Sequence, residues 1–560
     1  MRTLKCLVLI VAVSAAPLAA QDQQPPSGLN EVVARIIARE NQAMETIRGY
    51  SPLVETYIQR VNNNKGKDEG WEPAGDRYFI GRADFSKGLN LEPIEARNDN
   101  PLRQAFVDLN RFFDFGIEYL PKGFLQMIYP DTNGLNIQTY TFAYVRREFL
   151  GEVRTLVFDV TPSKKAGKGR FMGRIWVDDE SFTIVRFNGS YSGGNDSSRK
   201  FDFDSWRVNA GPNLWLPAFI YSEENAPKYL LTGAISSKAQ TRLWGYNIGR
   251  THEEQELSRV LIESTEPVID KSQQNTDLTP LQQKRAWDLQ AENNIIDRLQ
   301  RQGLIAPRGE VDKILETVVN NLEVTNNLNL DPDVRCRVLM TSTIESFAVG
   351  RTIVLSRGLV DVLPDEASLA AIIAKELGHV VLDRKTDTRY AFYDRLIRFD
   401  EKKTFQHFDF ARGREEDAAA GAKAAELLKN SPYKDQLRTA GMFIAELQKR
   451  SREIPNLISP RLGASILIRP SVAADTEDKP DANQIVALPL GGRVKLDPWD
   501  DTLDLLKSKP VGSITEREKM PFEITPFVLY LTRVTSEPPK TTEFTGSPHP
   551  ESSVLGTRSE

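Results

Sequence analysis

The sequence predicts an α+β protein of several domains, in which a helix and a curved antiparallel sheet precede a mainly helical domain with a small sheet. The first observation is a change of period. Apolar residues recur at helical spacing in residues 29–50 and then give way to short alternating segments rich in β-branched and aromatic residues. The second is that helical patterns return from about residue 280. The length of 560 residues suggests about three or four domain-sized pieces.

Composition places the chain among soluble globular proteins, because 27% of its residues are charged and 40% are hydrophobic. The formal net charge of -5 is small for this length, and the chain has no long basic run. We therefore expect no nucleic-acid partner.

The first 20 residues are typical of a signal peptide. Arg2 and Lys5 precede an apolar run that is too short to span a bilayer comfortably, and small residues near position 20 offer a cleavage site. A membrane anchor is the alternative. No later segment has about 18 consecutive apolar residues, so we expect no transmembrane span after leader removal and a periplasmic or secreted protein. Cleavage would leave Cys336 as the one cysteine, so no internal disulfide is expected.

Residues 21–265 are expected to form the β domain. Its clearest hairpin, Gly173 to Gly189, turns near Asp178 to Ser181. This hairpin resembles the one repeated in LolA-like lipoprotein-sorting proteins, which are exported half-barrels with a helical lid and an apolar concavity. The resemblance implies a β half-barrel with a helical lid and a lipid or lipoprotein ligand. In the alternative interpretation, the same aromatic residues fill a sheet core. These residues are Phe171, Trp176, Phe182 and Phe187.

The remaining boundaries follow from composition and helix signals. Thr279 and Pro280 are typical of a helix start after a polar stretch. Proline and polar residues rise again after about residue 451, interrupted by two apolar islands able to dock on a folded core. The expected pieces are a linker at 266–280, a metallopeptidase-like domain at 281–455, a docking extension at 456–535 and a disordered tail at 536–560.

Asp365 to Asp383 is predicted to be a helix that carries a group of polar residues. Lys375 and His379 lie one turn apart, and Glu376 is beside them. A zinc-binding helix uses this geometry, with two ligands one turn apart and a glutamate that takes a proton from the metal-bound water.

The stretch from Asp331 to Lys385 resembles the HtpX-like and BepA-like zinc endopeptidases of the gluzincin group. The resemblance rests on RTIVLSRGL at residues 351–359 and DEASLAAIIAKELGH at residues 365–379. It implies that Lys375 and His379 occupy the two helix-ligand positions, that Glu376 is the general base, and that zinc is the cofactor if the site is active.

Two positions depart from that family pattern. Lys375 stands where the family has histidine, and a lysine ammonium has no free lone pair for a metal. Placing Asp417 on the family's downstream aspartate puts Gly413 at the third ligand position. Glu415, Glu416 and Asp417 are nearby, and an acidic first turn favoured by the helix dipole is the alternative interpretation for them.

Two further hypotheses concern the charge at this site. In the first, His379, His407 and Glu416 hold a metal ion. Alternatively, the Lys375 ammonium takes the place of zinc and pairs with Glu376, Glu415 or Glu416, which implies no cofactor.

Three functions remain open from the sequence. The first is a catalytically impaired relative that binds polypeptide along a strand edge between Ile344 and Gly350, at Glu345, Ser346 and Phe347. The second is an active zinc metalloendopeptidase acting on envelope proteins. The third is a lipid or lipoprotein carrier.

Overall fold

The structure is a computed structural model. It describes residues 28–63, 71–86, 88–94, 121–192, 200–225, 235–246, 279–392, 407–463, 466, 487–491, 493–496, 501–505 and 520–534. The expected signal peptide at 1–20, residues 266–278 of the expected linker, and the expected tail at 536–560 lie outside these residues.

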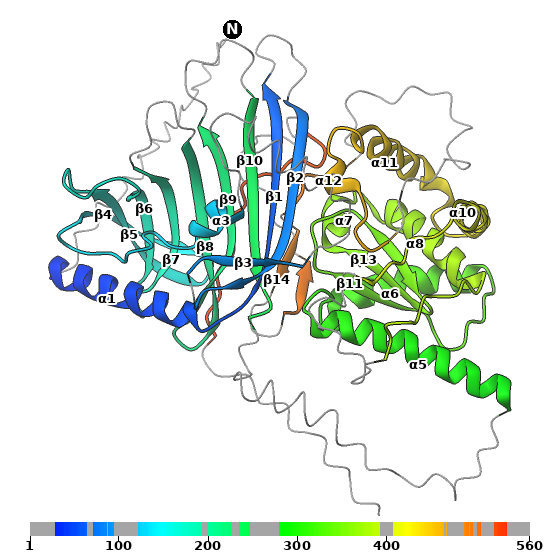
Figure 1. Ribbon diagram of the computed structural model, residues 1–560. Helices are drawn as coiled ribbons and strands as arrows, with labels where there is room; N and C mark the ends of the chain where they lie inside the picture. Colours follow the sequence, from blue (N-terminus) through cyan, green and yellow to red (C-terminus); the bar gives the residue numbers. More distant parts are fainter. Residues whose placement is uncertain are drawn as a thin grey trace, which may run out of the picture.

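An open antiparallel sheet forms the first part of the described chain (Figure 1). Its ten strands follow the order β3-β2-β1-β10-β9-β8-β7-β6-β5-β4, so the first and last strands of the domain meet at β1 and β10. The strands are β1 (Leu53–Asn63), β2 (Trp71–Asp84), β3 (Asn90–Pro93), β4 (Tyr140–Leu150), β5 (Val153–Pro162), β6 (Phe171–Asp178), β7 (Ile184–Tyr191), β8 (Lys200–Gly211), β9 (Leu214–Asn225) and β10 (Ile235–Trp244).

One face of this sheet packs against helix α1 (Leu29–Arg48) and the short helix α3 (Pro121–Gln126). Alternate residues of β1, such as Val54 and Ile58, point into this core. Deep within it, Arg207 of β8 makes two hydrogen bonds to the carboxylate of Glu40 in α1, at 2.6 and 2.7 Å, and both side chains are fully buried. This ion pair fixes the helix to the sheet.

The aromatic residues of the hairpin divide between the two faces. Phe171 and Phe187 are fully buried beneath the helices and meet edge to face at 5.8 Å, so both fill the core. Trp176 lies in the core on the opposite face, and Phe182 is a partly buried turn residue with positive φ.

The second part is mainly helical with a small sheet, as the sequence predicts. Its three strands follow the order β11-β13-β12, with β11 parallel and β12 antiparallel to β13. Strand β12 is therefore an edge strand. The elements are α5 (Pro280–Arg301), α6 (Glu310–Thr325), β11 (Arg335–Leu339), β12 (Ser346–Val349), β13 (Thr352–Ser356), α7 (Arg357–Val362), α8 (Glu366–Val381), α10 (Arg414–Lys429), α11 (Leu437–Arg450) and α12 (Pro455–Ile458).

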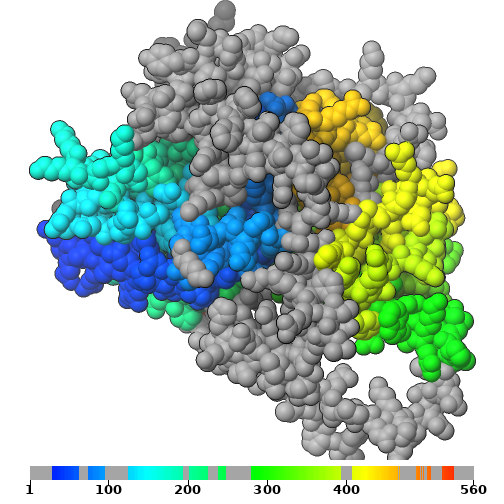
Figure 2. All heavy atoms as spheres, in the orientation of Figure 1, coloured from blue at the N-terminus to red at the C-terminus, as the bar shows by residue number. Residues whose placement is uncertain are grey.

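The two parts lie side by side (Figures 1 and 2). They share one hydrophobic core. The other face of β1 contributes Leu53 and Tyr57 to that core. At its centre, Glu55 of β1 pairs with Arg357 of α7 at 3.0 Å, and each side chain is 1% exposed. The Ser342 hydroxyl also donates to Glu55, at 2.6 Å. The sheet and the helical part are therefore joined by buried polar contacts as well as by apolar packing.

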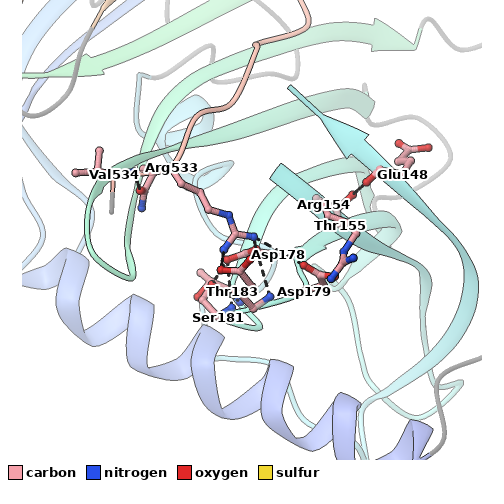
Figure 3. A network of polar contacts seen from close by, with 11 residues as sticks. Glu148, Arg154, Thr155, Asp178, Asp179, Ser181, Thr183, Arg533 and Val534 are labelled. Carbon is pink, nitrogen blue, oxygen red and sulfur yellow. Dashed lines mark hydrogen bonds and ion pairs between the residues drawn. The ribbon is translucent and has the colours of Figure 1, made fainter. Parts of the chain in front are cut away.

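A C-terminal segment, residues 520–534, runs back onto the sheet. Its Arg533 guanidinium bonds the carboxylates of Asp178 and Glu180 at the hairpin turn (Figure 3). The Glu152 backbone N–H donates to the Leu531 carbonyl at 2.8 Å. A short two-stranded sheet, β14 (Val494–Leu496) with β15 (Leu503–Leu505), lies between the two parts (Figure 1).

The predicted fold class is confirmed, with an antiparallel sheet and its helix first and a helical part with a small sheet second. Within the described residues, no helix is both long enough and apolar enough to span a membrane.

Candidate functional site

Helix α8 carries the motif and is buried along nearly its whole length. It begins where the Asp365 carboxylate accepts the Ser368 backbone N–H at 2.8 Å, which is an N-cap. Lys375, Glu376 and His379 are only 3%, 4% and 2% exposed. Because water does not reach these polar groups, each needs partners inside the protein.

Asp417, in the first turns of α10, faces the motif. Its Oδ1 lies 3.3 Å from the Lys375 Nζ and 3.1 Å from the His379 Nε2. A carboxylate only accepts, so the ring nitrogen that faces it carries a proton and has no free lone pair there. The other ring nitrogen of His379, Nδ1, is buried and has no hydrogen-bond partner among the described residues. The Asp417 carboxylate therefore contacts both residues at the predicted metal-ligand positions, Lys375 and His379.

Burial by itself would raise the pKa of Asp417, but its neighbours outweigh that effect. The hydrogen bond from His379 and the charge of Lys375 together hold the pKa of Asp417 below its usual range. The side chain is 29% exposed. Asp417 therefore remains a carboxylate at neutral pH, beside a lysine that has no counterpart in the family motif.

Helices α8 and α10 pack closely, and this brings Asp417 into contact with Lys375 and His379. A Cβ added at Gly378 would lie 2.6 Å from the Ala420 backbone oxygen, which is too close for any larger residue. Gly378 therefore lets α8 approach α10 at Ala420, which lies one turn after Asp417. The glycine of KELGH has a packing role as well as a place in the motif.

Glu376 points to the small sheet. The Ser346 hydroxyl donates to Glu376 Oε1 at 2.6 Å, and Ser346 is itself 1% exposed. Ser346 begins the edge strand β12, so Glu376 lies between α8 and that edge. The residue expected to be a general base is engaged by a hydroxyl of its own chain.

The predicted grouping of His379, His407 and Glu416 is not formed. Glu416 lies 3.8 Å from Arg384 and is half-exposed. His407 is exposed and stacks on the Tyr390 ring with centroids 5.0 Å apart. In the part of the chain that the structure describes, no three His, Cys, Asp or Glu side chains gather so as to hold a metal ion.

Lys375 pairs with a carboxylate other than those we expected. We expected Glu376, Glu415 or Glu416, and the acidic partner is Asp417. Gly413 is the N-cap of α10, and a Cβ built there meets nothing within 4 Å. The helical repeat of α10 explains why Asp417 and not Glu416 is the partner found. Asp417 lies one turn after Gly413 and faces α8, whereas Glu416 faces Arg384.

The predicted substrate edge is present but covered. Glu345, Ser346 and Phe347 are 0%, 1% and 2% exposed although they belong to or adjoin an edge strand. Phe347 stacks on Phe410 at 4.8 Å between ring centroids. Phe410 and Arg412, which cover this edge, are more than 60 residues away along the chain. Local sequence patterns therefore could not predict that the edge is covered.

These residues do not fit a zinc site. Zinc in proteins takes thiolate, imidazole or carboxylate ligands that offer lone pairs. Here one ligand position is an ammonium ion paired with a carboxylate, and the imidazole nitrogen beside it is a donor to that same carboxylate. The Lys375 ammonium already supplies a positive charge at this site.

Comparisons with known proteins agree with the motif. The sequence model of Peptidase family M48 matches residues 307–396, which contain α6, the small sheet and α8. No curated protein matches the chain.

Two solved structures are similar to part of the chain. One is a LolA superfamily protein from Nitrosomonas europaea, with 10% identity over 38% of this chain and 91% of that chain and a TM-score of 0.19. The other is a DUF1329 family protein from Desulfovibrio piger, with 11% identity over 41% of this chain and 98% of that chain and a TM-score of 0.20. TM-scores this low carry no inference about a ligand.

The family match covers the strand pair and the motif helix together, which are the segments that carried the resemblance in the sequence. Residues 307–396 are therefore similar to the M48 family of metallopeptidases, and the match does not extend to the rest of the chain.

Proposed function

We propose that the chain is an exported, non-catalytic M48 relative that binds polypeptide in the cleft where its catalytic relatives cut. The observation that carries this proposal is the contact of Asp417 with both Lys375 and His379. An ion pair at that point neutralises the site without a metal. The Lys375 ammonium offers no lone pair to a zinc ion that would polarise a peptide carbonyl or activate water.

The other features of the site, Glu376 and the edge strand β12, favour polypeptide binding over peptide-bond cleavage. Glu376 is retained, but it accepts a hydrogen bond from Ser346 of the neighbouring edge strand. Once the segments that cover it move aside, this edge strand would offer backbone groups to an extended peptide, which is a common mode of polypeptide recognition. The signal peptide that the sequence predicts at residues 1–20 supports export to the periplasm or the outside of the cell.

A cleavage assay with a matched variant tests the proposal. The purified chain and its Glu376→Gln variant are incubated with casein, and binding of reduced, unfolded casein is measured in parallel. We expect neither protein to cleave casein, and we expect both to bind it. Cleavage by the native chain that is lost in Glu376→Gln would contradict the proposal and establish an active peptidase. Co-purified lipid without any casein binding would contradict it in favour of a carrier.

A further inference from the structure

The edge strand β12 is covered by a later part of its own chain. Residues 455–463, called the strap here, begin with helix α12 and continue past it. The Ile344 backbone N–H, just before the strand, donates to the Leu457 carbonyl at 2.7 Å. On its other side the strap is held by the Phe410 N–H, which donates to the Leu462 carbonyl at 2.7 Å. The strap therefore lies between β12 and another segment of the peptidase-like part.

Glu345 anchors the end of the strap. Its Oε2 accepts three consecutive backbone N–H groups, from Arg461 at 2.9 Å, Leu462 at 2.9 Å and Gly463 at 3.2 Å. Its Oε1 accepts the Thr343 hydroxyl at 2.7 Å. Hydrogen bonds to a buried carboxylate are among the stronger ones in proteins. Glu345, one of the residues expected to contact a peptide substrate, thus binds backbone amides of its own chain.

Asp76 anchors the start of the strap from the other part of the molecule. This residue belongs to β2 of the large sheet, and its carboxylate accepts the backbone N–H groups of Asn456 at 3.1 Å and Leu457 at 2.8 Å. The Asn456 side-chain amide also donates to it, at 3.0 Å. The strap is thereby tied to the N-terminal sheet as well as to the peptidase-like part.

The end of the strap lies directly against β12. Antiparallel pairing turns alternate backbone groups away from the neighbouring strand, so Ser346 and Ala348 present theirs on the side away from β13. A Cβ on Gly463 would fall 2.5 Å from the Ser346 carbonyl oxygen, so only glycine fits there. The Ala348 carbonyl accepts the Arg412 guanidinium at 3.2 Å. Both outward carbonyls of the edge are therefore covered by the chain itself.

We propose that the strap is an internal stand-in for the polypeptide that β12 binds, and that its release opens the cleft. This inference rests on the proposed polypeptide-binding function. The edge of β12 would recognise an extended segment with a large apolar residue followed by glycine, as Leu462 and Gly463 provide. Because Asp76 belongs to the large sheet, movement of the sheet relative to the strap would control access to the edge.

Two variants release the strap from opposite ends, and a third is a control. Asp76→Asn weakens the anchor on the sheet. Gly463→Ala keeps both anchoring carboxylates, Asp76 and Glu345, and pushes the end of the strap away from Ser346. Asp204→Asn is the control, because Asp204 is buried on the same sheet and pairs with Arg186 there. All three are prepared in the full chain and compared with it by thermal unfolding.

Hydrogen exchange and trypsin cleavage report the opening. In the two strap variants we expect exchange of the Ser346 and Ala348 amides, and cleavage after Arg461, to accelerate on the order of tenfold, as loss of one charge-assisted hydrogen bond permits. The exchange rates of the β1 amides should be unchanged in the two strap variants. In Asp204→Asn, all exchange rates and the rate of cleavage after Arg461 should be unchanged. A synthetic peptide of residues 455–463, PNLISPRLG, should bind the opened variants more tightly than the native chain and restore slow exchange at β12.

Two results would overturn the inference. The first is unchanged exchange at β12 in both strap variants while they remain folded, since Gly463→Ala does not depend on Asp76. The second is an opened edge that the strap peptide does not protect. Failure of the proposed function looks different. In that case the strap peptide would protect β12, and unfolded casein would bind neither the native chain nor the opened variants.

Discussion

At the residue scale, the site depends on one substitution and its partner. Lys375 is almost fully buried, and such a lysine is stable only when its ammonium finds an acidic partner. Asp417 provides it and also accepts a hydrogen bond from His379. The pair therefore accounts for how a domain with a zinc-peptidase motif keeps its packed centre with a lysine in place of a histidine.

Removing the lysine side chain should destabilise the protein. For Lys375→Ala we expect a loss of roughly 2 to 4 kcal/mol in the free energy of unfolding, from the cavity and from the carboxylate that loses its cation. Lys375→Met keeps the apolar stem and should lose less than half as much. Urea denaturation measures both. Equal stability of the native chain and Lys375→Ala would show that the ion pair has no structural role.

Glu292 of α5 gives a prediction about pH. Burial, followed by repulsion from Asp288 and Asp383, raises the pKa of Glu292 to about 7. The folded protein therefore holds a proton that the unfolded chain has lost between about pH 4.5 and 7, so this group's contribution to stability falls as pH rises through that range. Glu292→Gln should remove a slope worth roughly 1 to 2 kcal/mol after allowance for partial exposure. Denaturation curves at pH 5 and pH 8 measure it, and an identical slope in the variant would contradict the prediction.

At the element scale, the approach of α8 and α10 positions the site. Gly378 and the buried Ala420 lie where the helices come closest, and this crossing brings Asp417 to the motif. Periodicity in the sequence predicted α8, and an acidic first turn of a second helix was one interpretation of Glu415, Glu416 and Asp417. The sequence did not identify Asp417 as the partner, because which face of the second helix meets the first depends on their packing and not on either pattern.

Widening that crossing should disturb the site. Gly378→Ala places a Cβ 2.6 Å from the Ala420 backbone oxygen, which cannot move independently of α10. We expect a loss of roughly 1 to 3 kcal/mol in the free energy of unfolding. Gly413→Ser is the matched control, because a Cβ there meets nothing within 4 Å and serine suits an N-cap. If the two variants were equally stable, the close approach would not be a constraint.

At the scale of the whole molecule, the large sheet and the peptidase-like part form one packed unit. Hydrophobic residues of β1 and β10 enter the same core as those of α6 and α8, and Glu55 pairs with Arg357 across the boundary. The sequence predicted each part from local periodicity. It could not predict the boundary or the strap, since those contacts join residues such as Glu55 with Arg357 and Asp76 with Leu457, each pair separated by about 300 residues or more along the chain.

This shared boundary predicts cooperative unfolding. The native chain should unfold in a single calorimetric transition. Glu55→Ala leaves Arg357 buried without its carboxylate, at a cost of roughly 3 to 5 kcal/mol, and should separate the transition into two. Glu40→Ala removes a carboxylate of equal burial inside the sheet part, so it should lower the transition without separating it. Two independent transitions in the native chain would contradict the account of a shared core.

The central claim is that the ion pair of Lys375 with Asp417 stands where catalytic relatives hold zinc. Metal analysis of the purified full chain tests it most directly, beside a Lys375→His/Gly413→Glu variant that restores both altered ligand positions. The account predicts that the native chain carries no stoichiometric zinc after dialysis against added zinc, and that the double variant gains it. About one tightly held zinc per native chain would contradict the account.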